Sequence, residues 1–311
     1  MNQLIRWNWI LLIGCLGSSL LGAGLWKSFQ EPVALLKTTT QWITDAQNQK
    51  VPVYPYQHIV SMAISCDEIL QKILVQPTRV LAYTASTLKS HPDRHWFQGR
   101  PFTYENTSLE ILLSWKPDLI LVAGHTDISI IQRLREAGIQ VFNIGTCSGV
   151  NSYLEQIRTL GSLLEEESRA HEYAKIFLRR LKRIAPESSK KNSKRVLYLE
   201  LYGDKMFGGG KNTSYNDVIL YAGFRDAAAE AHIEGYISYN VEKLLEINPD
   251  IIICAKGMKN LIRKIPGASE ALTAVQKEQI YEFPGTILSS ASDLMLLATE
   301  EVHAAISGED E

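Results

Sequence analysis

The chain contains an internal repeat that strongly limits the folds it can adopt. The sequence SLEILLSWKPDLIL at Ser108–Leu121 returns 132 residues later as NVEKLLEINPDIII at Asn240–Ile253. Each copy is typical of a short helix, a Pro-Asp turn and an apolar strand, a joint that is common in α/β proteins. Tyr104 and Tyr236 have the same separation, so the match extends into the loops before the two helices. The repeat therefore predicts two similar halves.

Strands alternate with helices around both copies of the repeat. Apolar strands are predicted at residues 58–62, 78–83, 118–122 and 140–144, and again at 195–201, 250–254 and 280–283. Apolar strands separated by helices are typical of parallel sheets that helices cover on both faces. The sequence thus predicts an α/β fold of two Rossmann-like lobes, at residues 56–149 and 187–311. Ligands of such sheets bind at the carboxyl ends of the strands, so we expect a cleft between the lobes.

Residues 150–186 are predicted to connect the two lobes. Apolar side chains recur at helical spacing from Val150 to Ile184, and Pro186 ends the pattern. An unbroken helix of this span is about 50 Å long, enough to run from one lobe to the other. We expect one long backbone helix, with residues 165–168 as the place where it could be interrupted.

The first 30 residues have a different character from the rest. No charged residue occurs from Trp7 to Trp26, a length that can cross a bilayer as a helix. Three interpretations stay open: a signal peptide cleaved near residues 22–24, an uncleaved membrane anchor, or a lipoprotein signal with lipidation at Cys15. All three place the rest of the chain in the periplasm or on the outer face of the cytoplasmic membrane. Residues 31–55 are predicted to form a linker.

Composition and motifs argue against several functions. The net charge of −2 does not suit a nucleic-acid-binding protein, which needs a basic surface. The chain has no nucleophile-elbow, zinc-protease, phosphate-loop or dinucleotide motif, so an enzyme is disfavoured and no cofactor is expected. No CxxC pair occurs among the cysteines. A Cys66–Cys147 disulfide and buried free thiols both remain open.

Several segments, taken in order, resemble one family of binding proteins. They are HIVSMAISCDEIL from His58, SLEILLSWKPDLIL, AGIQVFNI from Ala137, GKNTSYNDVILYAGF from Gly210 and YNVEKLLEINPDIII from Tyr239. Together they resemble the substrate-binding proteins of ABC importers for iron-siderophores, haem and cobalamin. The resemblance covers residues 56–306. It implies a rigid two-lobed clamp, a monomer by our expectation, that holds a small metal chelate and delivers it to an ABC permease in the cytoplasmic membrane.

The resemblance also implies two permease-docking residues, Glu110 and Glu242. Each occupies the same position in its copy of the repeat, in the first turn of a helix, where the helix dipole favours an anion. Two carboxylates fixed on separate lobes would present a two-point charge pattern to a basic partner. Ordinary helix capping, with Thr107 as the cap before Glu110, is the competing interpretation.

Aromatic and cationic residues near predicted strand ends are the candidate ligand contacts. In the first lobe they lie in an unusually aromatic loop between residues 91 and 107, and in the second lobe they follow the first strand or precede the repeated helix. Their rings could stack on a planar ligand and their charges could pair with an anionic chelate. The candidates are Trp96, Phe97, Arg100 and Tyr104 in the first lobe and Tyr202, Phe207, Lys211 and Tyr236 in the second.

Three other functions remain as alternatives. A membrane-tethered ligand sensor could use the same fold. Direct binding of a metal ion is disfavoured, because relatives that bind zinc or manganese place a histidine just after the first strand, where this chain has residues Ala63–Cys66. Enzyme activity is the least favoured. The sequence does not discriminate between siderophore, haem and cobalamin.

Overall fold

The computed structural model describes residues 41–90, 99–104, 107–185, 193–203, 205–288 and 290–308. The chain divides into two compact units, residues 1–41 and 42–311, and every element discussed here belongs to the second. The predicted signal or anchor at residues 7–26, including Cys15, lies outside the described residues. Among the helices of the described ranges, none combines the length and the apolar character that crossing a bilayer requires.

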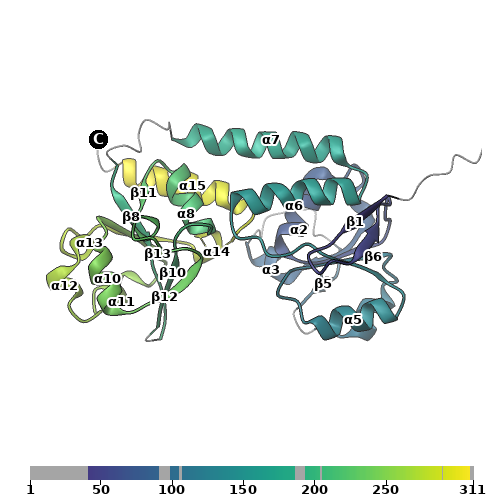
Figure 1. The fold of residues 1–311 in the computed structure, drawn as a ribbon, viewed down its shortest axis with the longest axis horizontal. Coiled ribbons are helices and arrows are strands. Elements are labelled where there is room, and N and C mark those ends of the chain that lie inside the picture. Colours follow the sequence, from purple (N-terminus) through teal and green to yellow (C-terminus); the bar gives the residue numbers. More distant parts are fainter. Residues whose placement is uncertain are drawn as a thin grey trace, which may run out of the picture. The chain divides into compact units, whose positions relative to one another are not determined.

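The first lobe is built on a five-stranded parallel sheet in the order β5-β4-β3-β6-β7. Short helices follow the strands, as the alternating pattern predicts (Figure 1). The strands are β3 (Ile59–Met62), β4 (Val80–Thr84), β5 (Phe102–Thr103), β6 (Leu119–Val122) and β7 (Gln140–Asn143). The helices are α2 (Ile64–Ile73), α3 (Ala85–Ser90), α4 (Leu109–Ser114) and α5 (Ile128–Glu136), with the 3-10 turn η1 (Pro77–Arg79).

The second lobe repeats four neighbouring strands of the first. Its parallel sheet has the order β11-β8-β13-β14, which corresponds to β4-β3-β6-β7. These strands are β8 (Arg195–Tyr198), β11 (Arg225–Asp226), β13 (Ile251–Ala255) and β14 (Ile280–Phe283). The helices are α8 (Ser214–Tyr221), α9 (Ala227–Glu230), α10 (Val241–Ile247), α11 (Lys259–Ile262), α12 (Ala268–Ala271), α13 (Thr273–Gln276), α14 (Gly285–Leu288) and α15 (Leu294–Ser307). The predicted two-lobed α/β fold is confirmed.

Matching local contacts explain why the repeat recurs. Ser108 and Asn240, which are equivalent, cap α4 and α10 by accepting the N–H of Ile111 and Lys243. The prediction that Thr107 caps this helix is therefore wrong. Its hydroxyl instead accepts the N–H of Tyr104 at 2.6 Å.

The Pro-Asp turn of each copy fastens a helix to the sheet. Lys116 and Asn248 both end their helices with positive φ, 52° and 39°. Asp118 then accepts the backbone N–H of His58 at 2.8 Å, and Asp250 accepts that of Arg195 at 2.8 Å. Each aspartate thus ties the turn to the start of the neighbouring strand.

The hydrophobic core is continuous between the lobes. Alternate residues of a strand point to opposite faces of its sheet. Leu119 and Leu121 of β6 and Ile251 and Ile253 of β13 all pack into one cluster, which also contains α2, α6, α7, α8 and α15 side chains. The opposite sheet faces have separate clusters, one in each lobe. A shared core of this kind restrains movement between the lobes.

The predicted single backbone helix is wrong. Residues 150–184 form two helices, α6 (Val150–Leu163) and α7 (Glu167–Ile184), which lie side by side (Figure 1). Glu165 has a φ of 58°, and the N–H of Glu166 bonds to the Gly161 carbonyl at 2.7 Å, so the chain turns back. The Glu166 carboxylate pairs with buried Arg79 at 2.9 Å, which fixes the turn.

The helix pair still connects the lobes. Helix α6 packs on α2 of the first lobe, whereas α7 packs on α2 and also on α8 and α15 of the second. The first N–H of α6, that of Val150, donates to Asp217 of α8 at 2.6 Å. A side chain on Gly149 would overlap this carboxylate, so glycine allows the second lobe to cap the connecting helix.

The predicted linker is wrong from residue 42 onward. An antiparallel hairpin of β1 (Trp42–Thr44) and β2 (Lys50–Pro52) packs against the first lobe. Ile43 and Val51 point into the core, and buried Asp45 pairs with Arg135 at 2.8 Å. Alternation over three residues is too short a signal to have identified these strands.

Candidate ligand-binding cleft

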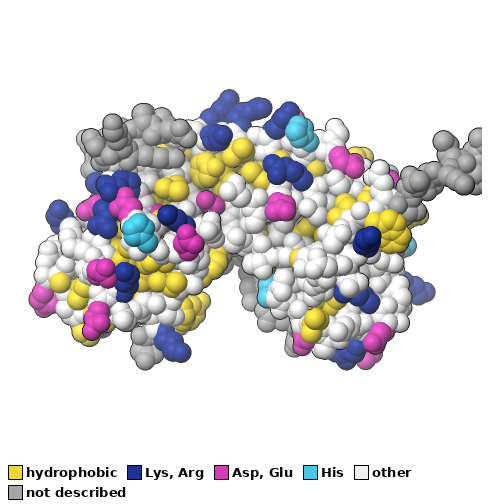
Figure 2. Space-filling view, in the orientation of Figure 1, with side chains coloured by type: hydrophobic (Ala, Val, Ile, Leu, Met, Phe, Trp, Pro, Cys, Tyr) yellow, Lys and Arg dark blue, Asp and Glu magenta, His cyan; other side chains and the backbone are white. Residues whose placement is uncertain are grey.

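A cavity of about 1110 Å³ opens at the carboxyl ends of the first-lobe strands and faces the second lobe. The space-filling view shows a hollow between the lobes on one side of the α6–α7 pair (Figure 2). The second lobe contributes Tyr236 and residues 290–292. The first lobe contributes residues 62–65, 84–86, 103–104, 123, 125–127, 130 and 145–147. The position agrees with the ligand sites of open parallel sheets.

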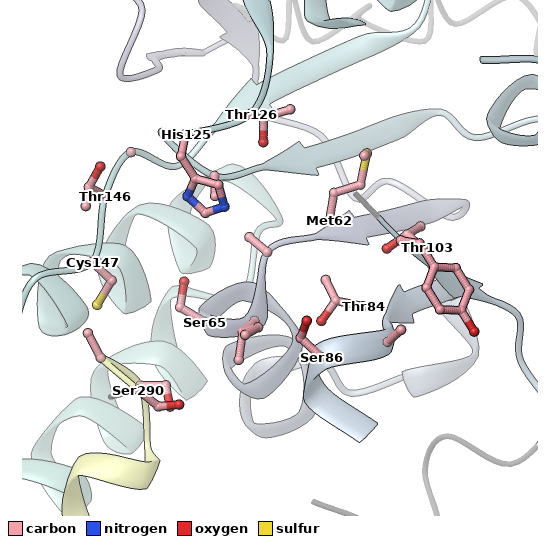
Figure 3. A pocket seen from close by; sticks show the side chains of 18 of the residues that line it. Met62, Ser65, Thr84, Ser86, Thr103, His125, Thr126, Thr146, Cys147 and Ser290 are labelled. Atoms are coloured by element: carbon pink, nitrogen blue, oxygen red, sulfur yellow. The ribbon is translucent and has the colours of Figure 1, made fainter. Parts of the chain in front are cut away.

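Each first-lobe strand delivers a polar side chain to the cavity from the residues just after it. Ser65 follows β3, Ser86 follows β4 and His125 follows β6 (Figure 3). Thr146 and Cys147 follow β7, and Ser290 of the second lobe also lines the cavity (Figure 3). The parallel direction of the strands brings these loops to one edge of the sheet, so the wall is a direct consequence of topology.

Hydroxyl groups dominate the polar character of the described lining. They belong to Ser65, Thr84, Ser86, Thr103, Thr126, Thr146, Ser290 and Ser292. The described lining contains His125 and Asp127 but neither lysine nor arginine. Such a wall can donate and accept hydrogen bonds without carrying a positive charge.

Thr84 is held in place by a buried carboxylate. Asp67 of α2 accepts hydrogen bonds from the Thr84 backbone at 2.8 Å, from the Thr84 hydroxyl at 2.8 Å and from the Thr87 hydroxyl at 2.6 Å. Asp67 is fully buried, and this burial raises its pKa to about 6. These hydrogen bonds to Asp67 therefore hold Thr84, and with it one wall of the cavity, in place.

The two tyrosines from equivalent positions of the repeat border the same cavity. Tyr104 is 59% exposed and Tyr236 is 52% exposed, although both are large aromatic residues. The Tyr236 hydroxyl donates to the Ser148 carbonyl at 3.4 Å, and its ring contacts Tyr215 edge-on with centroids 5.5 Å apart. Two exposed rings on opposite lobes are suited to contact a flat ligand.

The other predicted contacts are not brought to this cavity. Arg100 donates to the carbonyls of Val80 at 2.8 Å and Pro77 at 3.1 Å, at the far end of β4, because β5 runs parallel to β4 and its preceding residues meet that end. Exposed Tyr202 pairs edge-on with Phe207, and Lys211 is exposed; none of the three lines the cavity. Trp96 and Phe97 lie outside the described residues.

The glycines at 208–210 have a packing role. Gly208 and Gly209 belong to β10 (Lys205–Gly209), which pairs with β9 (Glu200–Tyr202) and β12 (Tyr236–Tyr239) in an antiparallel sheet that the sequence analysis did not predict. A Cβ on Gly208 would lie 2.6 Å from the Tyr198 carbonyl, and one on Gly210 would overlap the Ile233 carbonyl. The absence of a side chain at these positions therefore serves close packing within the second lobe.

An aromatic stack in the second lobe supports Tyr236 and was missed by the sequence analysis. Tyr198 and Tyr215 are stacked with centroids 3.8 Å apart, and the Tyr215 and Tyr236 rings meet at right angles. The Tyr198 hydroxyl donates to Glu200 at 2.7 Å. Burial raises the pKa of Tyr215 to about 12, so the stack stays neutral. Tyr215 lies within the GKNTSYNDVILYAGF segment, and this segment is the sequence feature that could have identified it.

Both predicted docking glutamates are exposed and lie in the first turn of their helices. Glu110 belongs to α4 and Glu242 to α10, and each lies two residues after its equivalent cap. Hydrogen bonds from the Glu110 backbone and from Ser108 lower the pKa of Glu110, so it stays ionised at neutral pH. The geometry provides one accessible carboxylate on each lobe, and docking itself stays a prediction.

The three described cysteines are free thiols, which excludes the Cys66–Cys147 disulfide in this structure. Cys66 and Cys254 are buried, and Cys147 lines the cavity. Burial raises the pKa of Cys147 to about 12. In the described ranges no three His, Cys, Asp or Glu side chains gather closely enough to hold a metal ion.

A family model for periplasmic binding proteins matches residues 102–286, more than half of the chain. The chain belongs to the periplasmic binding protein family. This membership confirms the resemblance seen in the sequence.

Individual relatives are more distant. An ABC transporter substrate-binding lipoprotein of Bacillus subtilis is 24% identical over 208 residues, which cover 65% of each chain. A cobalamin-binding protein of Halobacterium salinarum is 26% identical over 156 residues, 50% of this chain and 41% of the relative. The chain thus spans less than two thirds of the length of these relatives.

Solved structures of similar fold include two binding proteins with named ligands. The haem-binding protein of Roseiflexus superimposes with a TM-score of 0.67 at 20% identity, covering 82% of this chain and 99% of that one. The vitamin B12-binding protein of Vibrio cholerae gives a TM-score of 0.63 at 18% identity, covering 83% and 99%. At these identities the similarity is one of fold.

Proposed function

We propose that this protein is the substrate-binding component of an ABC importer and that it captures a bulky tetrapyrrole-type metal chelate, with a corrinoid such as cobalamin as the first candidate. The observation that carries this proposal is the 1110 Å³ cavity between Tyr104 and Tyr236, whose described lining is rich in hydroxyl groups and lacks lysine and arginine.

The size of the cavity supports a large ligand. Pockets for drug-sized molecules are roughly 300–1,000 Å³, so a cavity of 1110 Å³ suits something larger. The Tyr104 and Tyr236 rings are about half exposed and lie on opposite lobes, so a flat ligand that contacts both would bury the most aromatic surface. A tetrapyrrole has both the size and the flat faces.

The chemistry of the lining discriminates between chelates. Hydroxyl groups match the neutral amide groups around a corrin ring, because both donate and accept hydrogen bonds. Ligands with several carboxylates usually meet arginine or lysine in a binding site, and the described lining has neither. The name of the Halobacterium relative supports the same choice.

Haem is the second candidate because one wall residue can ligate iron. His125 follows β6 at the cavity, and a neutral imidazole is a common axial ligand of haem. The haem-binding proteins of similar fold support this alternative. Haem carboxylates would then need cationic partners from outside the described lining.

Delivery completes the proposed function. The chain is exported and held at or beyond the outer face of the cytoplasmic membrane, and Glu110 and Glu242 dock to cationic residues of a permease. The lipoprotein name of the Bacillus relative supports export. The protein binds and releases its ligand unchanged, so no turnover is expected.

A titration of the purified 42–311 unit tests the ligand class. Cyanocobalamin, haem and a ferric hydroxamate siderophore are each added while absorbance and tyrosine fluorescence are recorded. We expect cyanocobalamin to bind with a dissociation constant at or below the micromolar range and the siderophore to bind far more weakly. Preference for haem, with a shifted Soret band that His125→Ala removes, would select the second candidate. Binding of none of the three would refute the proposal.

A further inference from the structure

A buried carboxyl group is one of the contacts between the two lobes. Glu68 of α2 is fully buried and accepts the backbone N–H of Asp293, the cap residue of α15, at 2.8 Å. Asp293 directly follows Ser292 in the chain. Because Ser292 lines the cavity, Glu68 joins a first-lobe helix to a second-lobe segment of the cavity wall.

The contact joins two acids. The Asp293 carboxylate lies close enough to Glu68 for its charge to disfavour the ionised form of Glu68. Among the described residues, the other titratable groups that face Glu68 are Tyr153 of α6 and Cys147 from the loop after β7. Tyr173 of α7 reaches this cluster through its hydrogen bond to the Tyr153 hydroxyl at 3.0 Å. Neighbouring Asp67 bonds to Thr84 and Thr87 within the first lobe.

Burial and the adjacent carboxylate both favour the protonated form of Glu68. Burial has the larger effect, the Asp293 charge adds to it, and together they raise the pKa of Glu68 well above its ordinary value. Loss of the proton would place two negative charges side by side in a site that excludes water, which is strongly unfavourable.

We propose that Glu68 is a positioning residue for ligand capture: its protonated side chain ties α2 to the start of α15 and sets the distance between the two walls of the cavity. Deprotonation loosens the tie and separates the walls. The inference rests on the proposed function for its effect on ligand affinity, whereas its effect on the lobes is independent of any ligand.

The sign of the pH dependence follows from the direction of the shift. The native protein holds the proton above pH 4.5, the ordinary value for a glutamate, whereas the unfolded chain releases it there. The contribution of Glu68 to stability is therefore complete below this pH. It declines as the pH rises from there to the raised pKa of the native state.

The ligand-free protein provides the first test. For the 42–311 unit, the thermal midpoint and the radius of gyration from X-ray scattering are measured across pH 5–9. Wild type should lose thermal stability and expand as the pH rises, whereas Glu68→Gln should stay compact with a flatter stability profile, because the amide oxygen still accepts the Asp293 N–H and the amide does not titrate. Asp226→Asn is the control, since Asp226 is an equally buried acid with a raised pKa inside the second lobe. It should alter the stability profile and leave the pH-dependent expansion intact.

Ligand affinity provides the second test. Wild-type affinity for cyanocobalamin should fall by up to about tenfold per pH unit above the transition, as expected for one linked proton. Glu68→Gln should hold the low-pH affinity throughout, and Glu68→Ala should bind weakly at every pH. If Glu68→Ala does not fold, Glu68→Gln alone carries the comparison.

Two results would overturn the inference. One is a wild-type radius of gyration that does not change with pH. The other is a Glu68→Gln protein that expands or loses affinity with pH as wild type does. Failure of every chelate to bind, with the pH-dependent expansion present, would refute the proposed function and leave the tie between the lobes standing.

Discussion

Replacing Glu110 and Glu242 together by alanine should abolish uptake of the chelate while leaving its affinity for the purified protein unchanged. Both carboxylates are exposed, one on each lobe, and neither lines the cavity. Close charge pairs across an interface are worth about 1.5–7 kcal/mol, so loss of two should lower uptake at least about 100-fold. Each single replacement should have a smaller effect.

Uptake is measured in cells or proteoliposomes that contain the complete importer, and affinity is measured on the purified protein. The matched control replaces Glu136 of α5 and Glu270 of α12, which are also exposed and also lie on separate lobes. This control should transport normally. Unchanged uptake by the Glu110 and Glu242 variant would contradict the docking assignment, and an equal loss of affinity would point to damaged folding.

Replacing Tyr104 and Tyr236 by alanine should remove most of the ligand affinity. Each ring lies at the mouth of the cavity from its own lobe. Aromatic residues at the centre of an interface commonly cost about 2 kcal/mol or more when truncated, so the double variant should bind at least about 100-fold more weakly. Phenylalanine at both positions should retain most of the affinity if stacking is the main contribution.

Tyr54→Ala is the matched control for this pair. Tyr54 is 55% exposed, close to the values for Tyr104 and Tyr236, but it follows the β1–β2 hairpin and does not line the cavity. Its replacement should leave affinity unchanged. An affinity loss below threefold for the Tyr104 and Tyr236 double variant, measured by titration calorimetry, would exclude stacking between the lobes.

The repeat made most of the fold predictable, because it records contacts that both lobes need. Asp118 and Asp250 each fasten a strand, and Lys116 and Asn248 each end a helix with positive φ. Such local requirements leave a visible trace in sequence. Continuous apolar runs such as Ile251–Ile253 likewise reveal strands that are buried on both faces.

The sequence indicated where the break between α6 and α7 lies, but it did not show that the chain reverses direction there. Residues 165–168 are polar, yet the turn depends on Arg79, 87 residues away from Glu166. The spacing of apolar residues along a helix gives no sign of an ion pair with a residue so distant in the chain. The β9-β10-β12 sheet was missed for a similar reason. Gly208 in β10 and Gly210 just after it serve close packing against Tyr198 and Ile233, which a sequence pattern does not reveal.

The candidate site was only partly predictable. Tyr104 and Tyr236 were found because the repeat relates them, and both line the cavity. Ser65 and Thr84 were missed because serine and threonine after a strand are common and acquire meaning only when the strand ends converge. Arg100 was assigned to the ligand from its residue type, whereas its backbone position places it at the opposite end of β4.

The position of the metal in a bound complex tests the central claim most directly. Crystals of the 42–311 unit grown with cyanocobalamin are measured at the cobalt absorption edge, and the anomalous map locates the metal without assumptions about the ligand. A cobalt peak inside the cavity, between Tyr104 and Tyr236, is the predicted result. A peak on an outer surface of either lobe would contradict the account.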